Sequence, residues 1–229
     1  RGGAFKLWAP TAQNVAVCTY ASGSSKASAI TPMRRDDDTG VWSAQAKGAY
    51  YQYLVDVMTP TAGIVRNLVT DPYSISLTTD SKRSYIANLN AAKLKPAGWD
   101  RTPSPKKVAA PTDMTVYELH VRDFSINDAS VPAPLRGKYA AFTQAGSQGM
   151  RHLRALAQAG LTDVHLLPVF DLATVPETGC VTPAIVPDGP AGEAAQAAVM
   201  AVAAKDCFNW GYDPLHFNAP EGSFASDAN

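Results

Sequence analysis

The chain has 229 residues, of which 46% are hydrophobic and 17% charged, and its 20 basic residues balance its 20 acidic ones. This composition is typical of a folded globular protein and excludes an intrinsically disordered chain. The balanced charge supplies no basic field to gather phosphates, so it argues against a nucleic-acid partner. No apolar stretch approaches the length of a membrane span, so no membrane partner is expected.

The first part of the chain predicts β structure. Short segments rich in aromatic and β-branched residues alternate with Gly, Pro and Ser turns, at residues 4–9, 15–20, 41–44 and 50–57. Strands at this spacing are typical of a β-sandwich. We therefore predict an immunoglobulin-like β-sandwich over residues 1–90, with Trp8 and Trp42 packed in its core.

Residues 91–113 differ from the segment before them. They contain four prolines and several lysines, and they show no strong hydrophobic periodicity. Such a composition is typical of a connecting segment between two domains. We therefore predict a linker over residues 91–113 and a second domain over residues 114–229.

The second domain begins with a β-α-β pattern. Residues 115–124 predict a strand with one apolar and one polar face, and residues 164–170 predict a nearly all-apolar strand. Between them, residues 147–159 carry apolar side chains at helical spacing, and Gly160 follows where a helix would end. This order implies a parallel pair with a right-handed crossover, and the polar strand face suits the interior of a (β/α)8 barrel.

The three cysteines, Cys18, Cys180 and Cys207, are widely spaced and form no CxxC pair. They match neither a metal site nor a dense disulfide framework. We favour buried free thiols for all three. A single bridge between Cys180 and Cys207 is the alternative that the sequence leaves open.

The segment Phe208–Pro214 gathers aromatic and polar side chains around Gly211. Sugar rings have apolar C–H faces and hydroxyl edges, so a carbohydrate site needs an aromatic platform with polar groups beside it. The competing interpretation is an ordered loop whose Trp210 and Tyr212 pack onto the core. Residue types alone favour that second interpretation, because aromatics beside Gly and Pro are common in ordered loops.

Several motifs that occur in one order along the chain favour the carbohydrate site over an ordinary ordered loop. Asn209–Pro214 resembles the Tyr-Asn-Trp-Gly-Tyr-Asp-Pro signature of the pullulanases and limit dextrinases, starch-debranching members of the α-amylase superfamily (glycoside hydrolase family 13), with Phe208 in place of the first Tyr. Further segments of this chain resemble segments of the same enzymes, in the same order. Residues 5–10 resemble the start of a carbohydrate-binding module, and residues 117–125 and 160–168 resemble the first barrel strands. Residues 220–225 resemble the segment that follows the signature.

The resemblance implies an internal piece of a retaining glycoside hydrolase that cleaves α-1,6-glucosidic branch linkages in pullulan and in limit dextrins of starch or glycogen. It implies that Tyr212 stacks on a glucose ring, that Asp213 accepts hydrogen bonds from sugar hydroxyls, and that Trp210 and Asn209 shape or contact the same site. The family's catalytic carboxylates lie on later barrel strands, which we expect beyond Asn229. We therefore assign no catalytic residue and no metal ligand here.

The same resemblance sets the expected partners. They are an α-glucan substrate, such as limit dextrin, pullulan or amylopectin fragments, and the remainder of the protein's own barrel. No cofactor is expected, although structural calcium in the full-length enzyme is compatible with the family. A plastid is our first prediction for the compartment, and secretion or a bacterial periplasm is the alternative.

Two other functions remain open from the sequence. One is a non-catalytic glucan-binding or scaffold protein with a truncated barrel. The other is an enzyme of the isoamylase or branching type, which the amino-acid sequence of residues 209–214 disfavours.

Overall fold

A computed structural model describes residues 2–105, 108–185 and 187–228. The chain divides into two compact units, the first running to Ala87 and including Leu215–Pro220, the second comprising Asn88–Pro214 and Glu221–Ala228. Among the described residues, no helix has the length and apolar character needed to cross a membrane.

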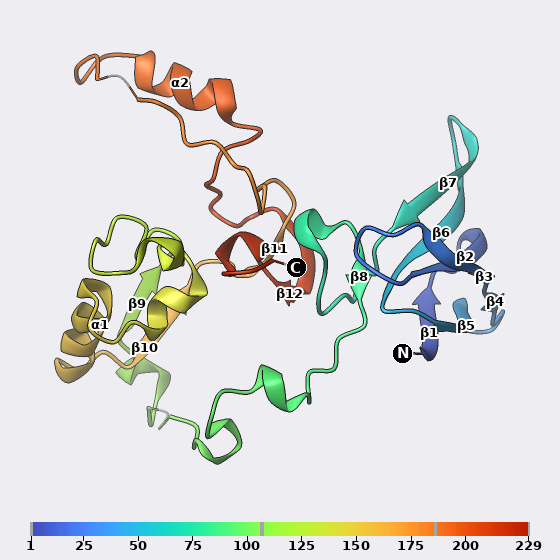
Figure 1. The fold of residues 1–229 in the computed structure, drawn as a ribbon, viewed down its shortest axis with the longest axis horizontal. Coiled ribbons are helices and arrows are strands. Elements are labelled where there is room, and N and C mark those ends of the chain that lie inside the picture. Colours follow the sequence, from blue (N-terminus) through green and yellow to red (C-terminus); the bar gives the residue numbers. More distant parts are fainter. Residues whose placement is uncertain (1, 106–107, 186, 229) are drawn as a thin grey trace. The chain divides into compact units, whose positions relative to one another are not determined.

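Two antiparallel sheets make up the first unit (Figure 1). One has the order β1-β5-β4, and the other has the order β3-β2-β6-β7 with β8 paired to β6. The strands are β1 (Gly2–Trp8), β2 (Ala12–Tyr20), β3 (Ala27–Pro32), β4 (Arg34–Arg35), β5 (Val41–Lys47), β6 (Tyr50–Thr59), β7 (Gly63–Val69) and β8 (Ser84–Tyr85). The predicted all-β character of this region is confirmed.

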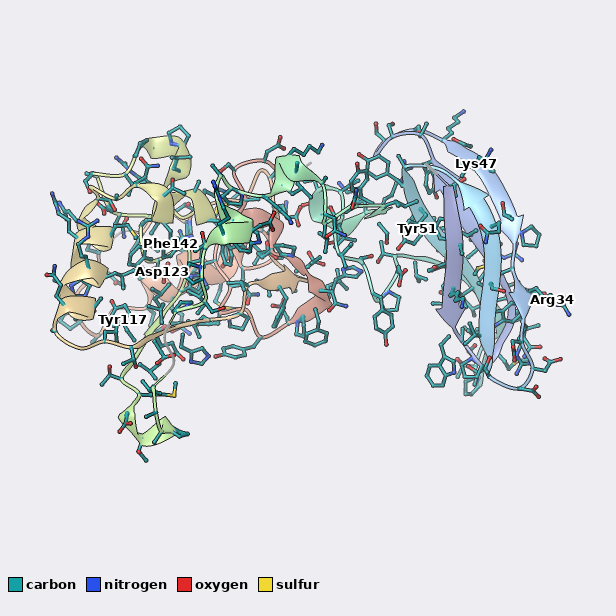
Figure 2. The ribbon with its side chains drawn as sticks, turned by 90° about the horizontal axis from the view of Figure 1, so that it is seen from below. Arg34, Lys47, Tyr51, Tyr117, Asp123 and Phe142 are labelled. Carbon is teal, nitrogen blue, oxygen red and sulfur yellow. A yellow bond between two sulfur atoms is a disulfide. The ribbon has the colours of Figure 1, made fainter. Side chains whose placement is uncertain are left out.

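Side chains from both sheets share one core. Tyr53 on β6 is almost fully buried, and its hydroxyl donates to the Lys6 carbonyl oxygen at 3.3 Å. The ring of Tyr51, labelled in Figure 2, lies edge-on to Phe5 with 5.0 Å between ring centroids. The buried members of this cluster are Phe5, Ala12, Val15, Val17, Met33, Trp42, Tyr53 and Val55. Apolar residues at alternate strand positions thus meet between the two sheets.

The prediction that both tryptophans are core residues is right for Trp42 and wrong for Trp8. Trp42 is 6% exposed, and its indole N–H donates to the Ala9 carbonyl oxygen at 2.9 Å. Trp8 is 70% exposed. The cause is the two-residue period of a strand, which sends Phe5 and Leu7 inward and therefore sends Lys6 and Trp8 to the other face.

A charged pair lies on the outer face of the larger sheet. Asp56 and Arg66 are cross-strand neighbours on β6 and β7, and the Arg66 Nε and Nη2 atoms donate to the two Asp56 carboxylate oxygens at 2.7 and 2.8 Å. These bonds hold the pKa of the Asp56 carboxyl below its usual value. The pair borders a hollow of about 270 Å³ whose other lining residues include Ile30, Pro32, Met33 and Leu54.

In the second unit, β9 (Val116–Leu119) and β10 (Asp163–Leu166) pair in parallel, and α1 (Gln148–Gln158) lies between them in the chain (Figure 1). The Ser147 hydroxyl oxygen caps α1 by accepting from the Met150 N–H at 3.2 Å. Gly160 has a φ of 108° just beyond the end of α1, as predicted. The Tyr117 ring on β9 (Figure 2) contacts His152 of α1, with 5.7 Å between ring centroids.

Both predicted strands of this unit are too long. The first ends at Leu119 instead of residue 124, because a tight turn follows in which the Phe124 N–H donates to the His120 carbonyl oxygen at 3.0 Å. The second divides at Pro168 into β10 and β11 (Phe170–Leu172), because proline has no N–H to donate to a ladder.

The remaining elements are α2 (Ala194–Val202), β12 (Pro214–Pro220) and short 3₁₀ helices. These 3₁₀ helices span Thr79–Ser81, Ala92–Leu94, Trp99–Arg101, Pro111–Asp113, Ala133–Leu135, Tyr139–Thr143 and Gly222–Phe224. Most of β12 belongs to the first unit, where the buried His216 places its Nε2 atom 2.8 Å from the Thr70 hydroxyl oxygen.

Candidate functional site

Two large aromatic side chains of the segment Phe208–Pro214 are exposed to solvent. Trp210 is 60% exposed and Tyr212 is 73% exposed. Gly211 between them is buried and has a φ of 91°, and a Cβ there would lie 2.8 Å from the Pro168 Cβ atom. Only glycine fits this backbone and this contact. The loop therefore turns tightly against Pro168 and leaves both aromatic side chains accessible to a ligand.

Hydrogen bonds of side chains and of the backbone fix both ends of this loop. The Asn209 Nδ2 atom donates to the Thr174 hydroxyl oxygen at 2.7 Å, and the Thr174 hydroxyl donates to the Asp213 Oδ2 atom. The Asn209 Oδ1 atom accepts from the Gly211 N–H at 2.7 Å, and the Asp213 carbonyl oxygen accepts from the Ala173 N–H at 2.9 Å. Two predicted site residues, Asn209 and Asp213, are thus joined through Thr174.

The two carboxylate oxygens of Asp213 differ in their surroundings. Oδ2 accepts from Thr174, whereas Oδ1 is covered and has no hydrogen-bond partner within the described part of the chain. A covered acceptor without a donor costs free energy. Asp213 thus keeps one unused acceptor beside the exposed Tyr212.

His120 packs against the first residue of the loop. It follows β9 directly and is only 7% exposed. Its ring centroid lies 5.2 Å from that of Phe208 and 5.5 Å from that of Phe224. The Phe208 ring also contacts Trp210 edge-on at 5.1 Å. The aromatic side chains of the loop therefore contact the buried rings of His120 and Phe224 through Phe208 and His120.

A disulfide joins Cys180 to Cys207, with 5.0 Å between the Cα atoms. The favoured prediction of free thiols is therefore wrong for this pair, and it is right for Cys18, which is free and buried. The neighbouring residues Val181 and Asp206 form a parallel β-bridge, which brings the two cysteines together. The disulfide fixes the residue that immediately precedes Phe208.

Comparison with known proteins gives the family. Residues 1–74 match the family described as Carbohydrate-binding module 48 (Isoamylase N-terminal domain). Pullulanase of Klebsiella pneumoniae is 39% identical over 99% of this chain and 25% of its own length. Pullulanase 1, chloroplastic, of Arabidopsis thaliana is also 39% identical, over 99% of this chain and 24% of its own length. The crystal structure of Klebsiella pneumoniae pullulanase complexed with maltotriose aligns with a TM-score of 0.87 and 37% identity, over 100% of this chain and 26% of that chain.

This chain is homologous to the pullulanases. The family predicted from the ordered motifs is thereby confirmed, as is a carbohydrate-binding module of β structure at the N-terminal end. The chain spans about a quarter of the length of the curated pullulanases that it matches.

A group of carboxylates lies near the pullulanase signature. One oxygen each from Asp171, Glu177 and Glu221 lies within 4.8 Å of the others, so these are residues that could hold a divalent cation. Glu221 is fully buried, and its two oxygens accept from the Leu172 and Ser223 N–H groups at 2.8 and 2.7 Å. Burial raises the pKa of the Glu221 carboxyl.

In the first unit, a second hollow of about 370 Å³ lies between the turn after β2 and the segment before β8. Tyr50 is the one aromatic residue in its lining, and Lys82 is the charged one. The other lining residues are Gly23, Ser24, Thr78 and Thr79. A hollow lined by polar residues and one aromatic ring is compatible with a small part of a sugar chain.

Sequence reasoning about the pullulanase motifs missed three residues of this region. His120 and Glu221 lie within matched motif segments but have no predicted role there, and Thr174 lies outside every matched segment. Each gains its role from a partner distant in sequence, with separations of 89 residues for His120 and Asn209, 35 for Thr174 and Asn209, and 49 for Glu221 and Leu172. No local pattern signals such pairings.

Proposed function

We propose that this chain is the substrate-contacting part of a retaining glycoside hydrolase that cleaves α-1,6-glucosidic branch linkages in pullulan and in limit dextrins. The observation that carries the proposal is the exposed pair Trp210 and Tyr212 on a fixed loop, in a chain homologous to pullulanases along its whole length. A homologous pullulanase has been crystallised with maltotriose, which supports an α-glucan ligand. We assign no catalytic residue to this chain.

Each side chain of the loop has a separate role in the proposal. Tyr212 stacks on a glucose ring next to the scissile bond, because a freely exposed ring offers its face to the C–H groups of a sugar. Asp213 accepts a hydrogen bond from a sugar hydroxyl. Trp210 extends the apolar surface, and Asn209 holds the loop through Thr174. Together these groups orient the substrate, which lowers the entropic part of the barrier without breaking a bond.

The second unit is proposed to begin a (β/α)8 barrel, with residues 114–229 as its N-terminal part, residues 91–113 as a linker and residues 1–90 as the binding module. The parallel pairing of β9 and β10 around α1 supports this. Val116, Val164 and Leu166 on these two strands are exposed, although strands of this kind are normally covered on both faces. Further barrel strands and helices would supply that cover.

The compartment is proposed to be oxidising. One homologue is named chloroplastic and others are bacterial. The disulfide between Cys180 and Cys207 is of the kind that persists outside reducing compartments. This favours secretion or a periplasm over a plastid.

The test is hydrolysis of pullulan by the full-length protein and its Tyr212→Ala variant. We expect the variant to lose most of its α-1,6 activity, whereas Tyr73→Ala, which removes an equally exposed tyrosine from the first unit, keeps normal turnover. Near-normal turnover by Tyr212→Ala would overturn the role of Tyr212. A wild-type protein that binds pullulan without cleaving it would indicate the scaffold alternative. Preference for amylopectin over pullulan, or branching of amylose, would indicate an isoamylase or branching enzyme.

A further inference from the structure

His120 is a buried polar residue whose hydrogen bonds determine where its proton lies. Its Nδ1 atom lies 3.2 Å from the Arg122 N atom and 3.4 Å from the Asp123 N atom, and both backbone N–H groups donate to it. A ring nitrogen that accepts hydrogen bonds carries no proton, so the proton of the neutral ring lies on Nε2.

The Nε2 atom lies 2.8 Å from the Asn209 carbonyl oxygen, to which it donates. A carbonyl oxygen can only accept, so both sides of the ring require the same tautomer. His120 therefore connects the turn after β9 to the backbone of the loop that carries Trp210 and Tyr212.

Two aromatic contacts restrict the ring further. Phe208 lies tilted at 37° to the His120 ring, and Phe224 meets it edge-on at 86°. The ring is thus enclosed by the residue before Asn209 and by the 3₁₀ helix Gly222–Phe224. An imidazole in such an enclosure has little freedom to take another rotamer.

The contacts of Asn209 are divided between its backbone and its side chain. His120 holds the carbonyl oxygen, and Thr174 holds the side-chain amide. The Gly211 N–H, next along the chain from Trp210, is in turn held by the Asn209 Oδ1 atom. A shift of the Asn209 backbone is therefore transmitted to the two exposed aromatic side chains.

We propose that His120 is a positioning residue that sets the backbone of Asn209, and through it the orientation of Trp210 and Tyr212 toward the glucan. The part of this inference that concerns the glucan rests on the proposed function, whereas the part that concerns the backbone of Asn209 does not. A histidine that merely fills the core would contribute stability without affecting the loop specifically. The two roles predict different results when the hydrogen bonds are removed and the ring volume is kept.

The experiment compares His120→Phe and His120→Gln in the full-length protein. Phe keeps an aromatic ring but cannot donate to Asn209, whereas the Gln amide can place a donor near the position of Nε2. Amide hydrogen exchange of residues 208–213 is measured against that of β9 and β10. We expect His120→Phe to accelerate exchange at Gly211 at least tenfold and to leave β9 and β10 unchanged, with His120→Gln intermediate.

The same variants are assayed on pullulan. We expect His120→Phe to raise KM about tenfold, on the scale of the one hydrogen bond that the loop itself loses, with a smaller effect on kcat and with partial recovery in His120→Gln. Unchanged exchange at residues 208–213, or equal acceleration across β9 and β10, would overturn the positioning role. If the wild-type protein did not hydrolyse pullulan, the proposed function would fail, and the exchange measurement would still decide the role of His120.

Discussion

Thr174 and Asn209 are 35 residues apart in the chain, and the Asn209 side-chain amide donates to the Thr174 hydroxyl at 2.7 Å. The intervening segment contains the Cys180–Cys207 disulfide and α2. The same hydroxyl donates to Asp213, so one small side chain serves both ends of the loop that carries Trp210 and Tyr212. Thr174, which precedes this segment, thus supports the loop that follows it.

Replacing Thr174 by Val removes this hydroxyl and keeps the shape of the side chain. Asn209 then loses an acceptor and Asp213 loses a donor, so we expect kcat/KM on pullulan to fall by about three- to tenfold, since an exposed hydrogen bond contributes roughly 0.5–1.5 kcal/mol. Thr174→Ser should retain most activity. Thr178→Val, at an exposed position of the same segment, serves as control. Equal activity of Thr174→Val and Thr178→Val would contradict the bridging role.

The sequence predicted those features that depend on local patterns. Alternation of apolar residues located four strands of the first unit, β1, β2, β5 and β6, and helical spacing with Gly160 located α1. The order of several motifs identified the family. Alternation did not determine the inner face of β1, because both Leu7 and Trp8 are hydrophobic and neighbouring strand positions point to opposite sides.

The candidate site was predictable only in part. Its exposed aromatics were found because Trp210 and Tyr212 lie within one short motif. The contacts that hold the motif come from His120 and Thr174, which belong to other segments, and no local pattern pairs these residues with Asn209. The disulfide could not be deduced, because the pairing of cysteines depends on the fold.

The Cys180–Cys207 disulfide closes a loop of 27 residues immediately before Phe208. Replacing both cysteines by Ser should lower the free energy of unfolding of this region by about 3 kcal/mol, since the open segment gains conformational entropy when unfolded. We expect faster amide exchange across residues 180–213 and a higher KM for pullulan. Cys18→Ala, which removes the free buried thiol, should change neither the amide exchange of residues 180–213 nor the KM for pullulan. Non-reducing peptide mass mapping must first recover Cys180 and Cys207 in one linked fragment, and their recovery as separate thiols would contradict the pairing.

The two tryptophans of the first unit give a test of its core. Trp42→Ala should lower the free energy of unfolding by about 3–5 kcal/mol, because it leaves a cavity between the sheets and frees the Ala9 carbonyl oxygen. Trp8→Ala should cost about 1 kcal/mol or less, since Trp8 is exposed and loses mainly one hydrogen bond to the Thr39 carbonyl oxygen. Urea unfolding followed by circular dichroism measures both. Similar costs for the two variants would contradict the assigned strand register.

Glu221 provides a prediction for the pH dependence of stability. Burial raises the pKa of its carboxyl, so the folded state binds that proton more tightly than the unfolded state does. The stability that Glu221 contributes is therefore complete below the ordinary glutamate pKa of about 4.3. It declines as pH rises from there to the raised pKa of the folded state, and it stays constant above that value.

Glu221→Gln removes the titrating group. The wild type accepts from Leu172 and Ser223 through two oxygens, whereas Gln has one, so we expect the variant to be less stable by about 1–3 kcal/mol. Because only the wild type loses stability as pH rises, this deficit should be largest near pH 4 and should shrink toward pH 7. Urea unfolding at a series of pH values measures the deficit, with the exposed Glu193→Gln as control for general charge effects. A deficit that grows with pH would mean that the buried carboxylate is stabilised by its two N–H donors more than it is penalised by burial.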